Sequence, residues 1–130
     1  MKPETEEWIR KAEGDWATMK RESQVKDDSN YDAICFHAQQ CAEKYLKAKL
    51  VDADISFKRT HDLLNLLDDI LTIEPTWTNL EECLTELTVF AVAYRYPGFF
   101  ATQDQAAKSV QNCCLIRDSA RQVFGLTVKK

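Results

Sequence analysis

The stretch "CFHAQQCAEKYLKAKL", residues 35–50, combines small apolar side chains at helical spacing with a set of larger polar side chains. Around it, apolar residues recur at steps of three and four, the period of an amphipathic helix running from about Ser29 to Val51. They are Tyr31, Ile34, Cys35, Ala38, Ala42, Tyr45 and Leu46. No strand-like alternation competes with this period elsewhere in the chain, so the stretch favours an all-α fold.

The same periodicity predicts four further helices, over about 4–22, 61–71, 78–96 and 102–124. Three residue pairs are spaced as capping boxes at helix starts: Ser29 with Asp32, Thr78 with Glu81 and Thr102 with Gln105. Thr60 is a candidate single N-cap. Gly125 suits the cap at a helix C-terminus. We predict an all-α, up-and-down four-helix bundle with an additional short helix closing one end, formed by residues 1–130 as a single domain.

Composition excludes several classes of protein. Hydrophobic residues make up 45% of the chain and charged residues 29%, with three glycines and three prolines, which is typical of a helical globular protein. The net charge of −4 gives no general attraction to a polyanion, so nucleic acid binding requires a local basic patch. No apolar run approaches the roughly 20 residues that span a bilayer, and the acidic N-terminus is unlike a signal peptide, which predicts a cytoplasmic protein.

The chain has five cysteines, which lie in predicted helices without the closely spaced pairs of a zinc site. They are Cys35, Cys41, Cys83, Cys113 and Cys114. We interpret them as reduced, mostly buried thiols and expect no bound metal and no cofactor. Hydrolytic triads, glycine-rich phosphate loops and metal-binding helix motifs are also missing from the sequence.

Polar residues form a continuous strip on the second predicted helix. His37, Gln40, Lys44 and Lys47 follow steps of three, four and three, which places them on one face. Such a strip offers donors, an acceptor and positive charge, which suits phosphate oxygens and a base edge. The alternative is a solvated helix face with Glu43 and Asp52 as counter-charges.

Two further clusters contain candidate ligand-binding residues. In "FKRTHDLL", Lys58, Arg59 and His61 come just before or at a helix start, where free N–H groups favour anions. Alternatively, Thr60 and Asp62 only cap that helix, and His61 packs or forms a hydrogen bond locally. In "YRYPGFF", Arg95 can satisfy the carbonyls at a helix end. The aromatic residues from Tyr94 to Phe100 form an apolar connection that either folds inward or meets a partner.

In these clusters the chain resembles the HEPN family, the "higher eukaryotes and prokaryotes nucleotide-binding" domains. The matching pieces are "YDAICFHAQQCAEKYLKAKL", "RTHDLLNLL" and "RYP", in this order. The resemblance implies an α-helical bundle that commonly dimerises and binds a nucleotide or RNA, often beside a small nucleotidyltransferase partner. The resemblance favours a ligand-binding role for the polar strip on the second predicted helix over a merely solvated helix face.

The chain departs from the family members that cut RNA, which resemble one another in an arginine followed after four to six residues by a histidine. Counting from Arg95, these positions hold Phe100, Ala101 and Thr102. Metal-independent RNA cleavage needs a group that exchanges a proton near neutral pH, and none of these three side chains does so. The sequence therefore predicts binding and no catalytic residue.

We expect a homodimeric protein that binds a nucleotide or short RNA and is paired with a small nucleotidyltransferase. The predicted ligand-binding residues are His37, Gln40, Lys44, Arg59, His61 and Arg95. One alternative is an RNA-cleaving toxin of a toxin–antitoxin pair, with Arg95 and an unidentified base. The other is a pure interaction module that docks a helical partner.

Overall fold

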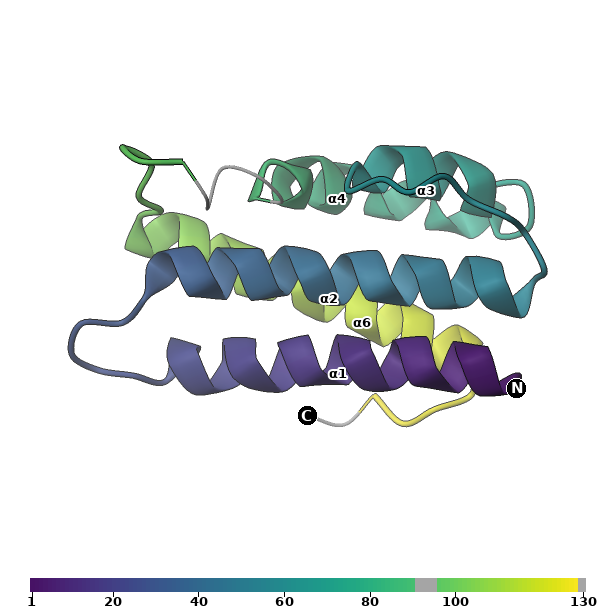
Figure 1. Ribbon diagram of the computed structural model, residues 1–130, viewed down its shortest axis with the longest axis horizontal. Coiled ribbons are helices and arrows are strands. Elements are labelled where there is room, and N and C mark those ends of the chain that lie inside the picture. Colours follow the sequence, from purple (N-terminus) through teal and green to yellow (C-terminus); the bar gives the residue numbers. More distant parts are fainter. Residues whose placement is uncertain (91–95, 129–130) are drawn as a thin grey trace.

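Three long helices form the body of the molecule. The computed structural model describes residues 1–90 and 96–128. The long helices are α1 (Pro3–Ser23), α2 (Tyr31–Asp52) and α6 (Gln103–Val123). Figure 1 shows α2 between α1 on one side and the shorter helices on the other, with α6 crossing behind. The described residues contain helices and no strands, which confirms the all-α prediction.

Shorter elements complete the fold. They are α3 (Leu63–Ile70), a 3-10 helix (Pro75–Leu80) and α4 (Glu81–Thr88). The predicted fourth helix was wrong at its start, because Pro75 begins a 3-10 turn that contains Thr78, and the α-helix follows only at Glu81. α3 does not close an end of the bundle; it packs lengthwise against α2 and α4 (Figure 1).

The core surrounds α2, which contacts α1, α6, α3 and α4. Twelve of its residues are buried, including the fully enclosed Tyr45 and Leu46. Small side chains such as Ala38, Cys41 and Ala42 let the neighbouring helices approach closely. Because α2 is covered on several sides, its polar residues have to find partners inside the protein.

One of the four N-caps predicted from the sequence is observed in the structure. Thr102 and Gln105 form the predicted capping box. Ser29, Thr60 and Thr78 are not the N-caps. Asn30 caps α2 by accepting a hydrogen bond from the Ala33 amide, and Leu80 precedes α4 without a side-chain cap. Asp62, which the capping alternative for its segment included, caps α3. Gly125 follows the end of α6 with a φ of 71°, a left-handed conformation that suits glycine.

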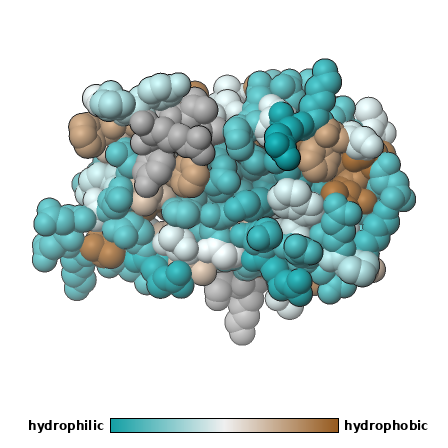
Figure 2. Space-filling view, viewed as in Figure 1, coloured by the Kyte–Doolittle hydropathy of each residue, from teal (hydrophilic) through white to brown (hydrophobic). Residues whose placement is uncertain are grey.

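The described residues include no helix long and apolar enough to cross a membrane. Cys35, Cys41 and Cys113 are buried, while Cys83 and Cys114 are half-buried. Burial raises the pKa of the Cys41 thiol well above its ordinary value. These positions agree with the interpretation of the cysteines as packing residues. Figure 2 shows a face that is mostly hydrophilic, with small hydrophobic patches toward both ends.

One ionic contact links the first and last helices. Arg117 on α6 is 4% exposed and binds both carboxylate oxygens of Glu13 on α1, at 2.8 Å from Nε and 2.9 Å from Nη2. Tyr45 on α2 also donates to Glu13, and Arg121 donates to the Tyr45 hydroxyl. Burial alone would raise the pKa of Glu13, but these hydrogen bonds lower it.

Replacing Glu13 by alanine should destabilise the fold, because it leaves the buried Arg117 guanidinium without its carboxylate. We expect a loss of about 3 kcal/mol in the free energy of unfolding, the lower end for breaking a buried pair, since Glu13 is 30% exposed. Denaturant unfolding measures this loss. Glu7→Ala is the control, because Glu7 is exposed on the same helix and should change stability by less than about 0.5 kcal/mol. Equal effects of the two substitutions would contradict this role.

Candidate functional site

The predicted polar strip on α2 does not form one solvated face. His37 and Lys44 both bind Asp15 on α1, with His37 Nδ1 2.7 Å from Oδ1 and Lys44 Nζ 2.5 Å from Oδ2. Asp15 is almost buried between the two helices. The positive charge of Lys44 is therefore already paired within the protein.

The protonation of Asp15 follows from these contacts. Burial alone would raise the pKa of this carboxyl, but the hydrogen bonds from His37 and Lys44 lower it below its ordinary value. Asp15 therefore remains ionised over a wider pH range than an exposed aspartate. Its contacts hold α1 and α2 in register as well as orienting His37.

A second polar group on α2 centres on Glu43, which is 3% exposed. Lys47 Nζ donates to Glu43 Oε2 at 2.9 Å, and Gln39 Nε2 donates to Oε1 at 3.0 Å. Gln40 is connected to this group, because its Nε2 donates to Gln39 Oε1 at 2.7 Å. Glu43 is thus a counter-charge, as the solvated-face alternative stated, but it is buried. Asp52, the other expected counter-charge, accepts a hydrogen bond from Thr5 on α1.

His61 joins the Glu43 group from the segment before α3. Its Nδ1 lies 3.0 Å from Glu43 Oε1, and its side chain is 54% exposed. The structure therefore brings His61 and Gln40 into one hydrogen-bonded network, through Gln39 and Glu43. His37 and Lys44 belong to the separate group around Asp15.

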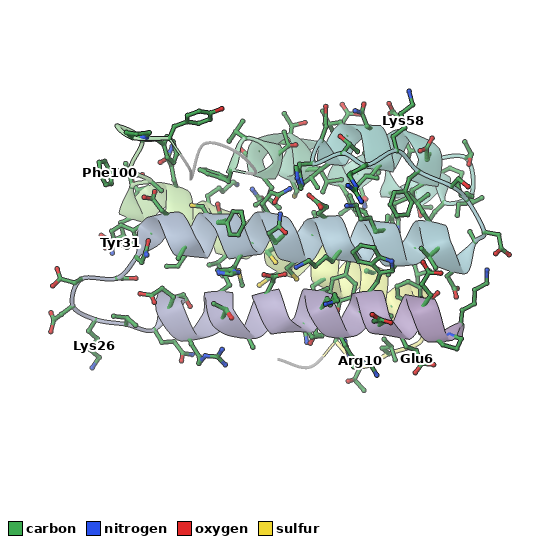
Figure 3. All side chains as sticks on the ribbon, viewed as in Figure 1. Glu6, Arg10, Lys26, Tyr31, Lys58 and Phe100 are labelled. Atoms are coloured by element: carbon green, nitrogen blue, oxygen red, sulfur yellow. The ribbon has the colours of Figure 1, made fainter. Side chains whose placement is uncertain are left out.

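Lys58 and Arg59 line a surface hollow of about 630 Å³ between the segment 56–60 and α3. Neither side chain forms an ion pair within residues 1–90 and 96–128. Figure 3 shows Lys58 projecting away from the helices on the α3 side. Asn65, Asp68 and Asp69 of α3 also line the hollow. The hollow is thus lined by two cations from the segment 56–60 and by two carboxylates from α3.

The N-terminus of α3 is less open to an anion than the sequence suggested. The Asp62 carboxylate accepts from the Leu64 amide at 3.0 Å, and the Leu63 amide donates to Thr88 Oγ1 at 3.1 Å. A carboxylate at this position repels a second anion. The cationic side chains, and not the helix end, are therefore the stronger feature of the hollow.

Arg95 lies outside the described residues, but the three positions that replace the histidine are described. Phe100 is 80% exposed. The Ala101 amide donates to the Asp32 carboxylate at 2.6 Å, and Thr102 caps α6. Each position thus has a structural role or an apolar side chain, and none supplies a group that transfers protons near neutral pH.

Asp15 was not among the residues predicted to contact the polar strip. A signal was present, because Asp15 falls three residues after Ala12 and four before Met19, within the apolar stripe of α1. A charged residue in such a stripe is buried and needs a partner of opposite charge. Within the described residues, no group of three or more histidine, cysteine or acidic side chains is placed to hold a metal ion.

A family model for the HEPN domain matches residues 5–123 of the chain. Comparisons with curated proteins and with solved structures give no significant match.

Asp15 should make stability depend on acid pH. Its folded pKa is lowered, so its contribution is present above the ordinary aspartate value of 3.8 and is lost as the pH falls through the folded pKa. Asp15→Asn should therefore cost about 1 kcal/mol at neutral pH, a modest value because His37 and Lys44 are partly exposed. Its deficit should shrink below pH 3.8.

Denaturant unfolding across a pH series measures this deficit. Asp27→Asn is a suitable control, because Asp27 is exposed and has no ion pair within the described part of the chain. An Asp15→Asn deficit that persists unchanged at acid pH would show that the ionised carboxylate is not its source.

Proposed function

Because the chain belongs to the HEPN family, we propose that it binds a nucleotide or a short nucleic acid segment without cutting it. The observation that supports this most strongly is the hollow beside Lys58 and Arg59. Their charges have no carboxylate partner in the described residues, in contrast to Lys44 and Lys47. Unpaired cations beside a concave surface suit a phosphate-bearing ligand.

The ligand lies against Lys58 and Arg59, because the carboxylates of Asp68 and Asp69, which line the same hollow, repel an anion. Arg59 supplies a bidentate donor for phosphate oxygens. His61, two residues further along, extends the site toward Gln40 through their shared network.

His37 and Lys44 belong to the proposed site only through the exposed parts of their side chains, since Asp15 already binds both. Arg95 remains part of the proposal as a cation supplied by the segment before Tyr96.

Binding without cleavage is favoured by the residues that follow Arg95. Phe100, Ala101 and Thr102 stand where RNA-cutting relatives are expected to have a histidine, and none exchanges a proton near neutral pH. The alternative, an RNA-cleaving toxin of a toxin–antitoxin pair, requires a base from another segment.

The protein is also proposed to form a homodimer and to act beside a small nucleotidyltransferase. Tyr96 and Phe100 support an interface, because they are 64% and 80% exposed and large apolar side chains seldom remain in water together. If this surface docks a partner and the hollow binds nothing, the protein is an interaction module.

Arg59→Ala should weaken binding of a nucleoside triphosphate or a short RNA by about ten- to a hundredfold, because a charge-assisted contact is worth roughly 1.5–3 kcal/mol. Calorimetry with a panel of nucleotides and oligonucleotides measures the affinity. Arg10→Ala is a matched control, since Arg10 is exposed on α1, at the edge of the molecule opposite Lys58 (Figure 3). We expect the control to bind as the unaltered protein does.

Two results would overturn this function. Absence of binding at millimolar concentrations would leave the interaction module in its place. Cleavage of single-stranded RNA that is lost in an Arg95→Ala variant would show that the protein is a ribonuclease.

Phe100→Ser should shift the protein from dimer to monomer at micromolar concentrations, because it removes a large apolar contact from the proposed interface. Light scattering measures the mass. Leu115→Ser is the control, because Leu115 is 52% exposed on α6, away from the Tyr96–Phe100 segment in sequence. A monomeric unaltered protein would refute the dimer directly.

A further inference from the structure

We propose that, whenever the His61 ring is neutral, Glu43 holds its proton on Nδ1, so that Nε2 accepts a hydrogen bond from a hydroxyl or amino group of the ligand. Glu43 is then a positioning residue and His61 a specificity-determining one. The identity of the ligand rests on the proposed function, whereas the role of Glu43 rests on geometry alone.

The Glu43 carboxylate is surrounded by hydrogen-bond donors. Gln39 donates to Oε1 and Lys47 donates to Oε2, at 3.0 and 2.9 Å. His61 Nδ1 lies 3.0 Å from Oε1. A carboxylate between an ammonium and an amide N–H is an acceptor, so the imidazole nitrogen that faces it has to carry a proton.

The Glu43 side chain is also held in place by Lys47. Lys47 has a 10% exposed side chain and lies over two rings, 5.5 Å from the centroid of Trp8 and 5.7 Å from that of Phe57. This arrangement fixes the ammonium beside Glu43 Oε2. The other carboxylate oxygen, Oε1, therefore stays in place to accept from His61 Nδ1.

Hydrogen bonds also anchor the backbone of His61. Its carbonyl oxygen accepts hydrogen bonds from Gln39 Nε2 at 3.4 Å and from Thr88 Oγ1 at 3.3 Å. The same Thr88 hydroxyl oxygen accepts from the Leu63 amide. The residue is thus held at Nδ1 and at its carbonyl, while about half of the side chain remains exposed.

A neutral imidazole with a proton on Nδ1 has one remaining hydrogen-bonding atom, Nε2, and it is an acceptor. Nε2 has no hydrogen-bond partner within residues 1–90 and 96–128. Lys58 and Arg59 are only donors, so the segment 58–61 carries donors that line the hollow and, at His61 just outside its lining, one acceptor. Arg59 and His61 are two residues apart, so their Cα atoms are at most about 7 Å apart.

The ligand that fits this segment is a phosphate ester that carries a hydrogen-bond donor about one nucleoside away. A ribose hydroxyl and an exocyclic amino group of a base share this chemistry. An ester without a donor at that point leaves Nε2 unsatisfied and binds less tightly.

The other histidine of the chain provides an internal comparison. His37 Nδ1 is bound to Asp15 in the same manner, so its neutral ring should carry the same tautomer. His37 faces α1, however, and shares its carboxylate with Lys44, whereas His61 adjoins the segment with unpaired cations. A change at Asp15 should therefore alter His37 and leave His61 unaffected.

The first test is a long-range ¹H–¹⁵N correlation spectrum of the ¹⁵N-labelled full chain in mildly alkaline buffer, which distinguishes the imidazole tautomers. We expect His61 to show a protonated Nδ1 and a bare Nε2. Glu43→Gln should shift its signals toward a mixture of tautomers, because an amide can donate as well as accept, and Glu43→Asp should restore part of the original pattern. Asp15→Asn should change only the signals of His37.

The spectrum of the unaltered protein decides the matter even if Glu43→Gln does not fold. A His61 ring with its proton on Nε2 would overturn the proposal.

The second test compares the binding of AMP, 2′,3′-dideoxy-AMP and IMP by calorimetry. We expect the unaltered protein to bind one of the two analogues about three- to tenfold more weakly than AMP. A weaker dideoxy compound identifies a hydroxyl donor, and weaker IMP identifies the amino group. The difference should disappear in His61→Ala.

The two proposals fail in distinguishable ways. If Arg59→Ala weakens AMP binding and His61→Ala does not, the nucleotide site stands and the recognition role of His61 is wrong. If none of the three compounds binds at millimolar concentration, the proposed function and the recognition role fail together. The tautomer spectrum then judges the positioning role of Glu43 separately.

Discussion

The bidentate contact between Arg117 and Glu13 is the constraint on which the arrangement of the long helices depends. It joins residues 104 positions apart, and Tyr45 from α2 donates to the same carboxylate. Arg117 also lies 4.4 Å above the ring of Trp16, so its guanidinium is stacked as well as paired. A buried charge is costly without its partner, which makes any other register of α1, α2 and α6 unfavourable. The guanidinium pKa rises accordingly, chiefly because of the hydrogen bond to Glu13.

The central position of α2 has a direct consequence for function. A helix covered by its neighbours has to satisfy its polar side chains internally, and α2 does so through Asp15 on one side and Glu43 on the other. The lysines on this helix therefore contribute more to packing than to the attraction of a ligand. Two cations without an ion pair in the described part of the chain, Lys58 and Arg59, lie instead on the segment that leads into α3, where a hollow gives them access to solvent. We therefore place the proposed binding surface beside Lys58 and Arg59 and not along α2.

The polar groups around Asp15 and Glu43 differ in how much of their histidine side chain remains accessible to a ligand. Around Asp15, a histidine and a lysine share one nearly buried carboxylate between two helices. Around Glu43, the lysine is enclosed by aromatic rings while the histidine remains half exposed. The same chemistry, a carboxylate with an imidazole and an ammonium, thus holds two helices together in one place and orients an accessible side chain in the other. Tertiary position, and not residue type, separates these roles.

The sequence by itself determined the helical fold, most of the apolar stripes and the family, because each of these depends on local periodicity or on short motifs. Ile9, Ile34 and Ile116 are buried as the steps of three and four predicted. Capping was less predictable, since Asn30 competes with Ser29 for the same few amides and a 3-10 turn at Pro75 delays α4. Only the tertiary structure decided which charges are paired. Asp15 is 22 residues from His37 and 29 from Lys44, and His61 is 18 from Glu43. Such contacts arise when separate helices pack, because burial forces each charged group to find the nearest opposite charge in space, and no local pattern specifies which one that is.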